Sequence, residues 1–132
     1  YLGADAVLLI VRILTPQLLK SFLYLTWSLG MDALVEAHNA EEIRRALAAG
    51  ADIIGVNNRN LKDFSVSFET SLNLRKSVPF NIVFVAESGI HTAEEIERLR
   101  EARVDAVLIG EKMMTSRNKK AALAELRGTD EG

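Results

Sequence analysis

Residues 30–57 read GMDALVEAHNAEEIRRALAAGADIIGVN, and this stretch contains one complete unit of the fold. The apolar runs 33–36 and 53–57 lack the polar alternation of half-exposed strands, so they are typical of parallel strands covered on both faces. Between them, residues 40–49 carry apolar side chains at helical spacing. This order predicts a right-handed βαβ unit whose two strands lie side by side.

The same unit recurs along the chain. Further buried strands are predicted at 6–11, 82–86 and 106–110, and further amphipathic helices at 16–29, 69–77, 92–102 and 118–127. A short glycine-acid turn precedes three of the strands, at Gly3-Ala4-Asp5, Gly30-Met31-Asp32 and Gly50-Ala51-Asp52. The pattern therefore predicts an α/β fold of five serial βα units with a parallel sheet, in one domain over residues 1–132.

Local signals mark the helix ends. Thr15 precedes Pro16 at a helix start, and Thr92 with Glu95 forms a capping box. Asn39 is a third cap, with Glu42 three residues later. Arg103 stands where the repeat favours glycine, so a left-handed conformation there costs about 1 kcal/mol.

Composition excludes several classes of protein. The chain has 132 residues, 48% of them hydrophobic, no cysteine and a net charge of −2. We expect no disulfide scaffold, no nucleic-acid partner, no membrane partner and a cytoplasmic location. We see no signal peptide at the first residues. A complete eight-unit barrel needs roughly 200 residues, so these residues alone are not one.

Functional side chains are expected where the strands end, because ligands of parallel βα folds bind at the carboxyl ends of the strands. Glu36 follows a buried run, so burial can raise its pKa to a value useful for acid–base chemistry. The alternative is a carboxylate that caps a helix or pairs with a lysine. Asn57 and Arg59 share strand parity, and an amide beside a guanidinium suits a ligand that bears a carboxylate. The alternative for Arg59 is a surface side chain.

Two glycine-bearing turns predict a phosphate site. Glu87-Ser88-Gly89 and Gly110-Glu111 follow the last two predicted strands. Glycine permits close backbone approach, and N–H groups at a following helix start attract an anion. Ordinary tight turns are the alternative. His38 and His91 are the two histidines and have no neighbouring ligand triplet, so no metal is expected.

Five motifs in register resemble indole-3-glycerol-phosphate synthase. These are Val7–Leu14, Leu34–His38, Gly55–Leu61, Val85–Ile90 and Val107–Glu111. The resemblance implies an incomplete (β/α)8 TIM barrel in which this chain supplies units four to eight. It implies a carbon–carbon lyase of tryptophan biosynthesis that needs no cofactor. Its phosphorylated substrate is 1-(2-carboxyphenylamino)-1-deoxyribulose 5-phosphate, which closes with loss of carbon dioxide and water.

The resemblance also assigns roles to residues. Glu36 and Asn57 correspond to catalytic residues, for proton transfer and substrate positioning. Arg59, Glu87 and Ser88 correspond to substrate-binding residues. Ser88, Gly89, Gly110 and Glu111 correspond to the phosphate-binding loops.

The resemblance also implies that one catalytic residue of the family is absent from this sequence. The family's general-acid lysine lies on strand three, outside this sequence, so we expect little activity from the chain alone. An incomplete barrel is expected to self-associate or to combine with the missing amino-terminal half. The open alternatives are a non-catalytic phosphate-binding half-barrel and another phosphate-binding barrel enzyme, such as a phosphoribosyl isomerase or thiamine-phosphate synthase.

Overall fold

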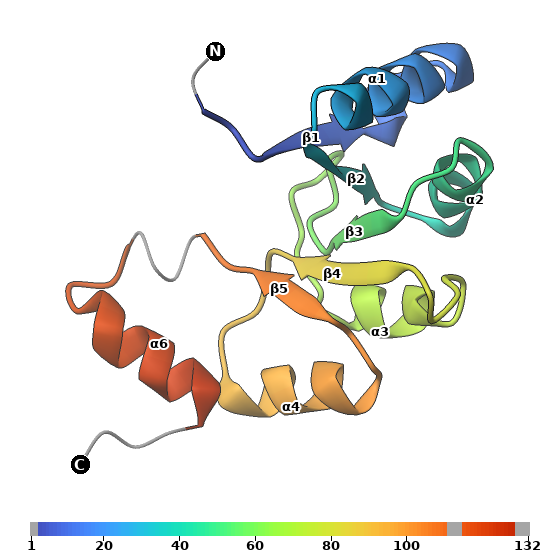
Figure 1. Ribbon diagram of the computed structural model, residues 1–132. Coiled ribbons are helices and arrows are strands. Elements are labelled where there is room, and N and C mark those ends of the chain that lie inside the picture. Colours follow the sequence, from blue (N-terminus) through green and yellow to red (C-terminus); the bar gives the residue numbers. More distant parts are fainter. Residues whose placement is uncertain (1–2, 111–114, 129–132) are drawn as a thin grey trace.

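The computed structural model describes residues 3–110 and 115–128 (Figure 1). One parallel sheet holds five strands in the order β1-β2-β3-β4-β5, so each strand pairs with its neighbours in the chain. The strands are β1 Ala6–Ile10, β2 Asp32–Ala37, β3 Ile53–Asn57, β4 Val83–Glu87 and β5 Ala106–Leu108. The helices are the 3-10 helix η1 Val11–Ile13, α1 Pro16–Ser28, α2 Ala40–Ala48, α3 Glu69–Arg75, α4 Ala93–Glu101 and α6 Lys119–Arg127. The predicted five βα units are confirmed.

The core lies between the sheet and its helices. Alternate residues of the middle strands face outward, and Val35, Ile54 and Phe84 are fully buried there. They pack in one cluster with Leu19 of α1 and Ile43 of α2. Burying each large apolar side chain contributes roughly 1.5–3 kcal/mol. Because successive strand residues point to opposite faces, this packing determines which side chains face the inner side of the sheet.

The predicted helix starts are confirmed. The Thr15 side chain accepts from the N–H of Leu18, and Asn39 accepts from that of Glu42. Thr92 and Glu95 make both hydrogen bonds of a capping box. Arg103 has a φ of 63°, so the expected left-handed conformation is present.

Several predicted boundaries are wrong, most of them by one residue. The first strand ends at Ile10 rather than Val11, because the chain turns there into η1. The fifth strand ends at Leu108, because β5 pairs with β4 over three residues alone. The helix predicted at 69–77 ends at Arg75. No helix in the described part of the chain is long and apolar enough to cross a membrane.

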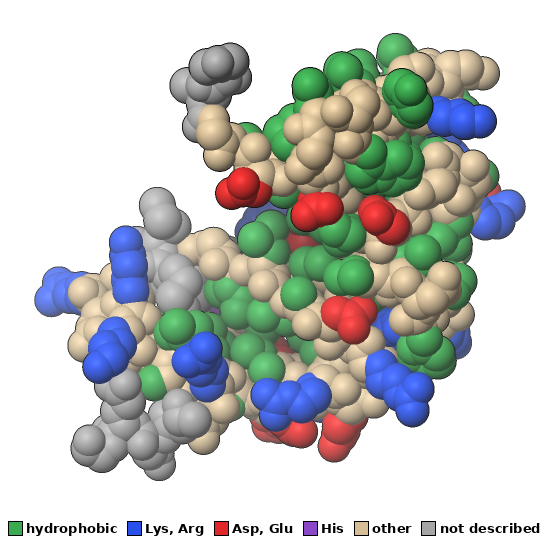
Figure 2. All heavy atoms as spheres, viewed as in Figure 1, with side chains coloured by type: hydrophobic (Ala, Val, Ile, Leu, Met, Phe, Trp, Pro, Cys, Tyr) green, Lys and Arg blue, Asp and Glu red, His purple; other side chains and the backbone are tan. Residues whose placement is uncertain are grey.

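The helices cover one face of a curved sheet, with α1 to α4 following one another around it (Figure 1). On the inner face, Leu8 of β1 is 50% exposed and Leu108 of β5 is 52% exposed. The space-filling view shows further hydrophobic side chains on the surface over α1, where Tyr24, Leu25 and Leu29 are exposed (Figure 2).

Candidate active site

Three neighbouring strands bring polar side chains to the inner face of the sheet. Glu36 of β2 is in register with Gly55 of β3, and Asn57 of β3 is in register with Glu87 of β4. Successive strand residues point to opposite faces. Since the residue before each of these three polar ones is buried in the outer core, their side chains face inward.

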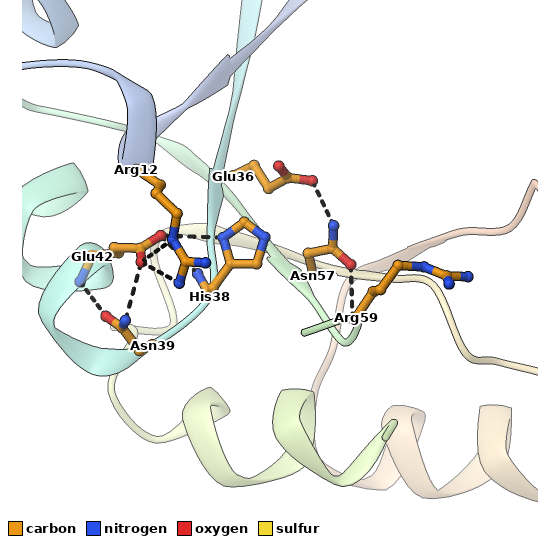
Figure 3. A network of polar contacts seen from close by, with 7 residues as sticks. All are labelled: Arg12, Glu36, His38, Asn39, Glu42, Asn57 and Arg59. Carbon is orange, nitrogen blue, oxygen red and sulfur yellow. Dashed lines mark hydrogen bonds and ion pairs between the residues drawn. The ribbon is translucent and has the colours of Figure 1, made fainter. Parts of the chain in front are cut away.

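Asn57 links two of the predicted site residues. Its Nδ2 donates to Glu36 Oε1 at 3.1 Å, and its Oδ1 accepts from the Arg59 backbone N–H at 2.9 Å (Figure 3). The second contact determines which end of the carboxamide is oxygen. The amide group therefore presents its N–H to the Glu36 carboxylate.

Glu87 is the most perturbed acid of the site. It is 3% exposed, and its Oε2 is a buried atom without a hydrogen-bond partner in the described structure. Burial raises the pKa of Glu87 to about 8, with further contributions from the hydrogen bond and the negative charge of Glu36. Glu87 therefore holds a proton at neutral pH, beside a second carboxyl group.

A cavity of about 490 Å³ lies over these carboxyl groups. Its polar lining comes from Glu36, Arg59, Glu87, Ser88 and His91. Gly89 and Gly110 line it as well, so both glycine-bearing turns reach the same cavity. Glu111, predicted to bind phosphate, lies outside the described residues.

The turn after β4 has an unusual backbone. Ser88 and Gly89 have φ values of 67° and 68°, so two consecutive residues are left-handed. A Cβ atom at Gly89 would lie 2.1 Å from Val66 Cγ1, so a side chain there would strain the backbone and force Val66 to move. The Asn58 side chain donates to the Ser88 carbonyl at 3.0 Å and fixes the turn from the neighbouring strand end.

A second polar cluster lies beside the site and was not anticipated beyond its helix cap. Glu42 Oε2 accepts from Arg12 at 3.1 Å and from Asn39 Nδ2 at 3.0 Å, while Oε1 accepts from the His38 backbone N–H at 3.2 Å (Figure 3). His38 Nδ1 also lies 3.2 Å from Oε1. The contact with Arg12 spans 30 residues, so local sequence carries no signal for it.

Metal ligands do not cluster in the described part of the chain. Residues 3–110 and 115–128 contain no group of three His, Cys, Asp or Glu side chains that could hold a metal ion.

Solved structures show the fold. The chain is similar to 3-hexulose-6-phosphate synthase from Salmonella typhimurium, with a TM-score of 0.78 and 14% identity over 96% of this chain and 61% of that one. It is also similar to thiamine phosphate pyrophosphorylase from Pyrococcus furiosus, with a TM-score of 0.72 and 22% identity over 95% of this chain and 58% of that one. These neighbours are TIM-barrel enzymes, so the expected incomplete (β/α)8 fold is confirmed.

Sequence relatives show the family. The family model described as indole-3-glycerol phosphate synthase matches residues 1–126. The chain is 57% identical to the indole-3-glycerol phosphate synthase of Lachnoclostridium phytofermentans, over 96% of this chain and 46% of the relative. It is 55% identical to that of Endomicrobium trichonymphae, over 96% of this chain and 49% of the relative. The chain thus spans about half the length of the curated relatives it matches. It belongs to the indole-3-glycerol phosphate synthase family.

Proposed function

We propose that this chain supplies the phosphate-binding end and two acid–base carboxyl groups of an indole-3-glycerol phosphate synthase. The observation that carries the proposal is the convergence of Glu36 and Glu87 in the cavity that Ser88 and Gly89 also line. Membership of the family supports the reaction. In it, the ring carbon that bears the carboxylate bonds to the C2 carbonyl carbon of the substrate, and carbon dioxide and water leave.

Glu36 and Glu87 divide the proton chemistry in this proposal. Glu87 is protonated at neutral pH, so it donates a hydrogen bond to an oxygen of the substrate's sugar chain. Glu36, oriented by Asn57, takes part in proton transfer and stabilises the positive charge that develops on the substrate nitrogen. Asn57 thereby positions both the carboxylate and the substrate.

The anionic ends of the substrate have separate partners. Ser88, Gly89 and Gly110 line the same cavity. Since the Ser88 N–H donates to the Leu108 carbonyl, the backbone N–H groups of Gly89 and Gly110 and the Ser88 hydroxyl are the donors assigned to the phosphate in this proposal. Arg59 lines that cavity and suits the substrate's carboxylate, since a guanidinium binds carboxylates in a bidentate fork. A bound phosphate gives remote binding energy that orients the reacting atoms.

Turnover needs groups beyond these 132 residues in our proposal. The family resemblance places a general-acid lysine in earlier βα units, and the curated relatives are about twice as long as this chain. We therefore expect the isolated chain to bind inorganic phosphate. Ring closure should need the earlier βα units as well.

Complementation tests this proposal. The chain is assayed for indole fluorescence with substrate, alone and mixed with the amino-terminal βα units of the Lachnoclostridium phytofermentans relative. We expect turnover in the mixture and phosphate binding without turnover by the chain alone. Near-normal turnover by the chain alone would overturn the claim that catalysis needs a lysine from the earlier βα units. A folded, associated mixture without turnover would overturn the synthase function and favour the non-catalytic phosphate-binding half-barrel.

A further inference from the structure

Gly55 occupies an unusual position in the middle of the sheet. It lies on β3, in register with Glu36 of β2 on one side and with Val85 of β4 on the other. Adjacent strands lie about 4.8 Å apart, so inward side chains on β2 and β4 start roughly 10 Å apart. A side chain on β3 would ordinarily fill the space between them. Two carboxyl groups from non-adjacent strands meet only if the middle strand leaves that space open.

The space over Gly55 is taken by the carboxyl group of Glu87. A Cβ atom built on Gly55 would lie 3.1 Å from both Cδ and Oε2 of Glu87, and 3.1 Å from Leu34 Cδ1. These separations are tighter than ordinary van der Waals contacts. Any side chain at position 55 therefore has to displace the Glu87 carboxyl, the Leu34 methyl or both.

The backbone gives no other reason for glycine at this position. Gly55 is absent from the residues with positive φ, so its conformation is open to any amino acid. Glycine inside a strand is unfavourable by roughly 0.5–1 kcal/mol relative to alanine. The missing side chain is thus best explained by the room it makes for Glu87.

We propose that Gly55 is a positioning residue. Its missing side chain seats the Glu87 carboxyl over β3, within hydrogen-bonding reach of Glu36, so that carboxyl groups from two non-adjacent strands share one proton. The catalytic consequence of this sharing rests on the proposed function, whereas the sharing itself does not.

Two further titratable residues line the cavity beside this pair of glutamates. Arg59 follows β3 and His91 follows β4, and these two complete the titratable lining of the cavity in the described structure. Oε2 of Glu87 has no donor in the described structure, and the Asn57 amide donates to Glu36. A shared proton therefore replaces the donors that a buried carboxylate ordinarily requires.

Carboxyl NMR tests the proposal directly. Glutamates labelled with ¹³C at Cδ are titrated between pH 4 and pH 10 in the wild-type chain, in Glu87→Gln and in Gly55→Ala. We expect one wild-type carboxyl to titrate near pH 8 and to be lost in Glu87→Gln. In Gly55→Ala we expect its midpoint to fall by a few tenths of a pH unit, because the added methyl group moves the carboxyl a few tenths of an ångström and weakens its contact with Glu36 while leaving it buried.

A second variant separates the two contacts of the added methyl group. In Gly55→Ala with Leu34→Ala, the Leu34 contact is gone and the Glu87 contact remains, so the lowered midpoint should persist. This double variant also serves if Gly55→Ala alone does not fold. A midpoint equal to that of the wild type in either folded variant would overturn the proposal. If the synthase function is wrong instead, the complemented chain shows no turnover although the midpoint still falls.

Discussion

Two buried glutamates of this chain have opposite surroundings. Glu42 is 5% exposed and receives hydrogen bonds from Arg12, His38 and Asn39. Glu87 is 3% exposed, has an oxygen without a partner in the described structure and faces the carboxyl group of Glu36. Similar burial is therefore combined with a full set of hydrogen-bond donors at Glu42 and with a raised pKa at Glu87.

The difference shows what each glutamate contributes. A buried carboxylate is stable when donors satisfy its oxygens, and it then ties together the elements that supply them. Glu42 joins η1, the end of β2 and the N-cap of α2 in this way. A carboxyl deprived of donors costs stability and keeps its proton near neutral pH, which suits acid–base chemistry.

The largest expected effect breaks the satisfied cluster. Glu42→Ala leaves the Arg12, His38 and Asn39 donors without their acceptor, so we expect the free energy of unfolding to fall by about 4 kcal/mol. Urea denaturation measures it. Arg12→Ala is the matched control and should cost about 1 kcal/mol, because the Arg12 side chain is 36% exposed. If both variants lost the same free energy of unfolding, Glu42 would not be the acceptor on which the whole cluster depends.

The next effect concerns Glu87 and pH. Burial raises its pKa to about 8 in the folded chain, from the ordinary glutamate value of 4.5. The folded chain binds a proton that the unfolded chain has lost, so the free energy of unfolding decreases as pH rises from about 5 to 8. We expect this decrease to be about 2 kcal/mol between pH 6 and pH 8.

Glu87→Gln isolates this contribution, because the other titratable groups remain. Urea denaturation at each pH gives the wild-type slope and the variant slope. The variant should lose the decrease that Glu87 causes and should be more stable than the wild type at pH 8. If the free energy of unfolding had the same pH dependence in both proteins, the pKa of Glu87 would not be raised. Glu87 would then not differ from Glu42 in this respect.

The smallest effect concerns strain beside Glu87. Ser88 has a φ of 67°, which costs a non-glycine residue about 1 kcal/mol. We expect Ser88→Gly to raise the free energy of unfolding by about 0.5 kcal/mol, since relief of strain is partly offset by a more flexible unfolded chain. Ser88→Ala keeps the Cβ atom and should give no gain. Thermal unfolding of the two variants compares them, and a gain in both would point to the lost hydroxyl rather than to the backbone.

The sequence predicts the order of elements well, because local patterns carry it. The strand at Ile53–Asn57 has the expected bounds, and the caps at Thr15, Asn39 and Thr92 follow from side chains within three residues. The positions of Glu36 and Asn57 at strand ends predict that both lie in the site, and the structure brings the two side chains into contact.

Long-range geometry accounts for what the sequence does not predict. Arg12 reaches Glu42 across 30 residues after an unanticipated turn into η1. The meeting of Glu36 and Glu87 depends on the empty position at Gly55, on a strand between them. The catalytic and phosphate-binding roles of the predicted residues remain predictions.

The contact between Gly89 and Val66 has a consequence for loop engineering. The segment after β3 closes on itself through hydrogen bonds from Asn60 N to the Ser65 carbonyl and from Ser67 N to the Asn58 carbonyl. Val66 from that segment occupies the place of a Gly89 side chain. Residues 58–67 and 88–89 therefore pack together as one structural unit. An engineered protein that exchanges these loops between related barrels has to transfer both segments together, because each segment packs against the other.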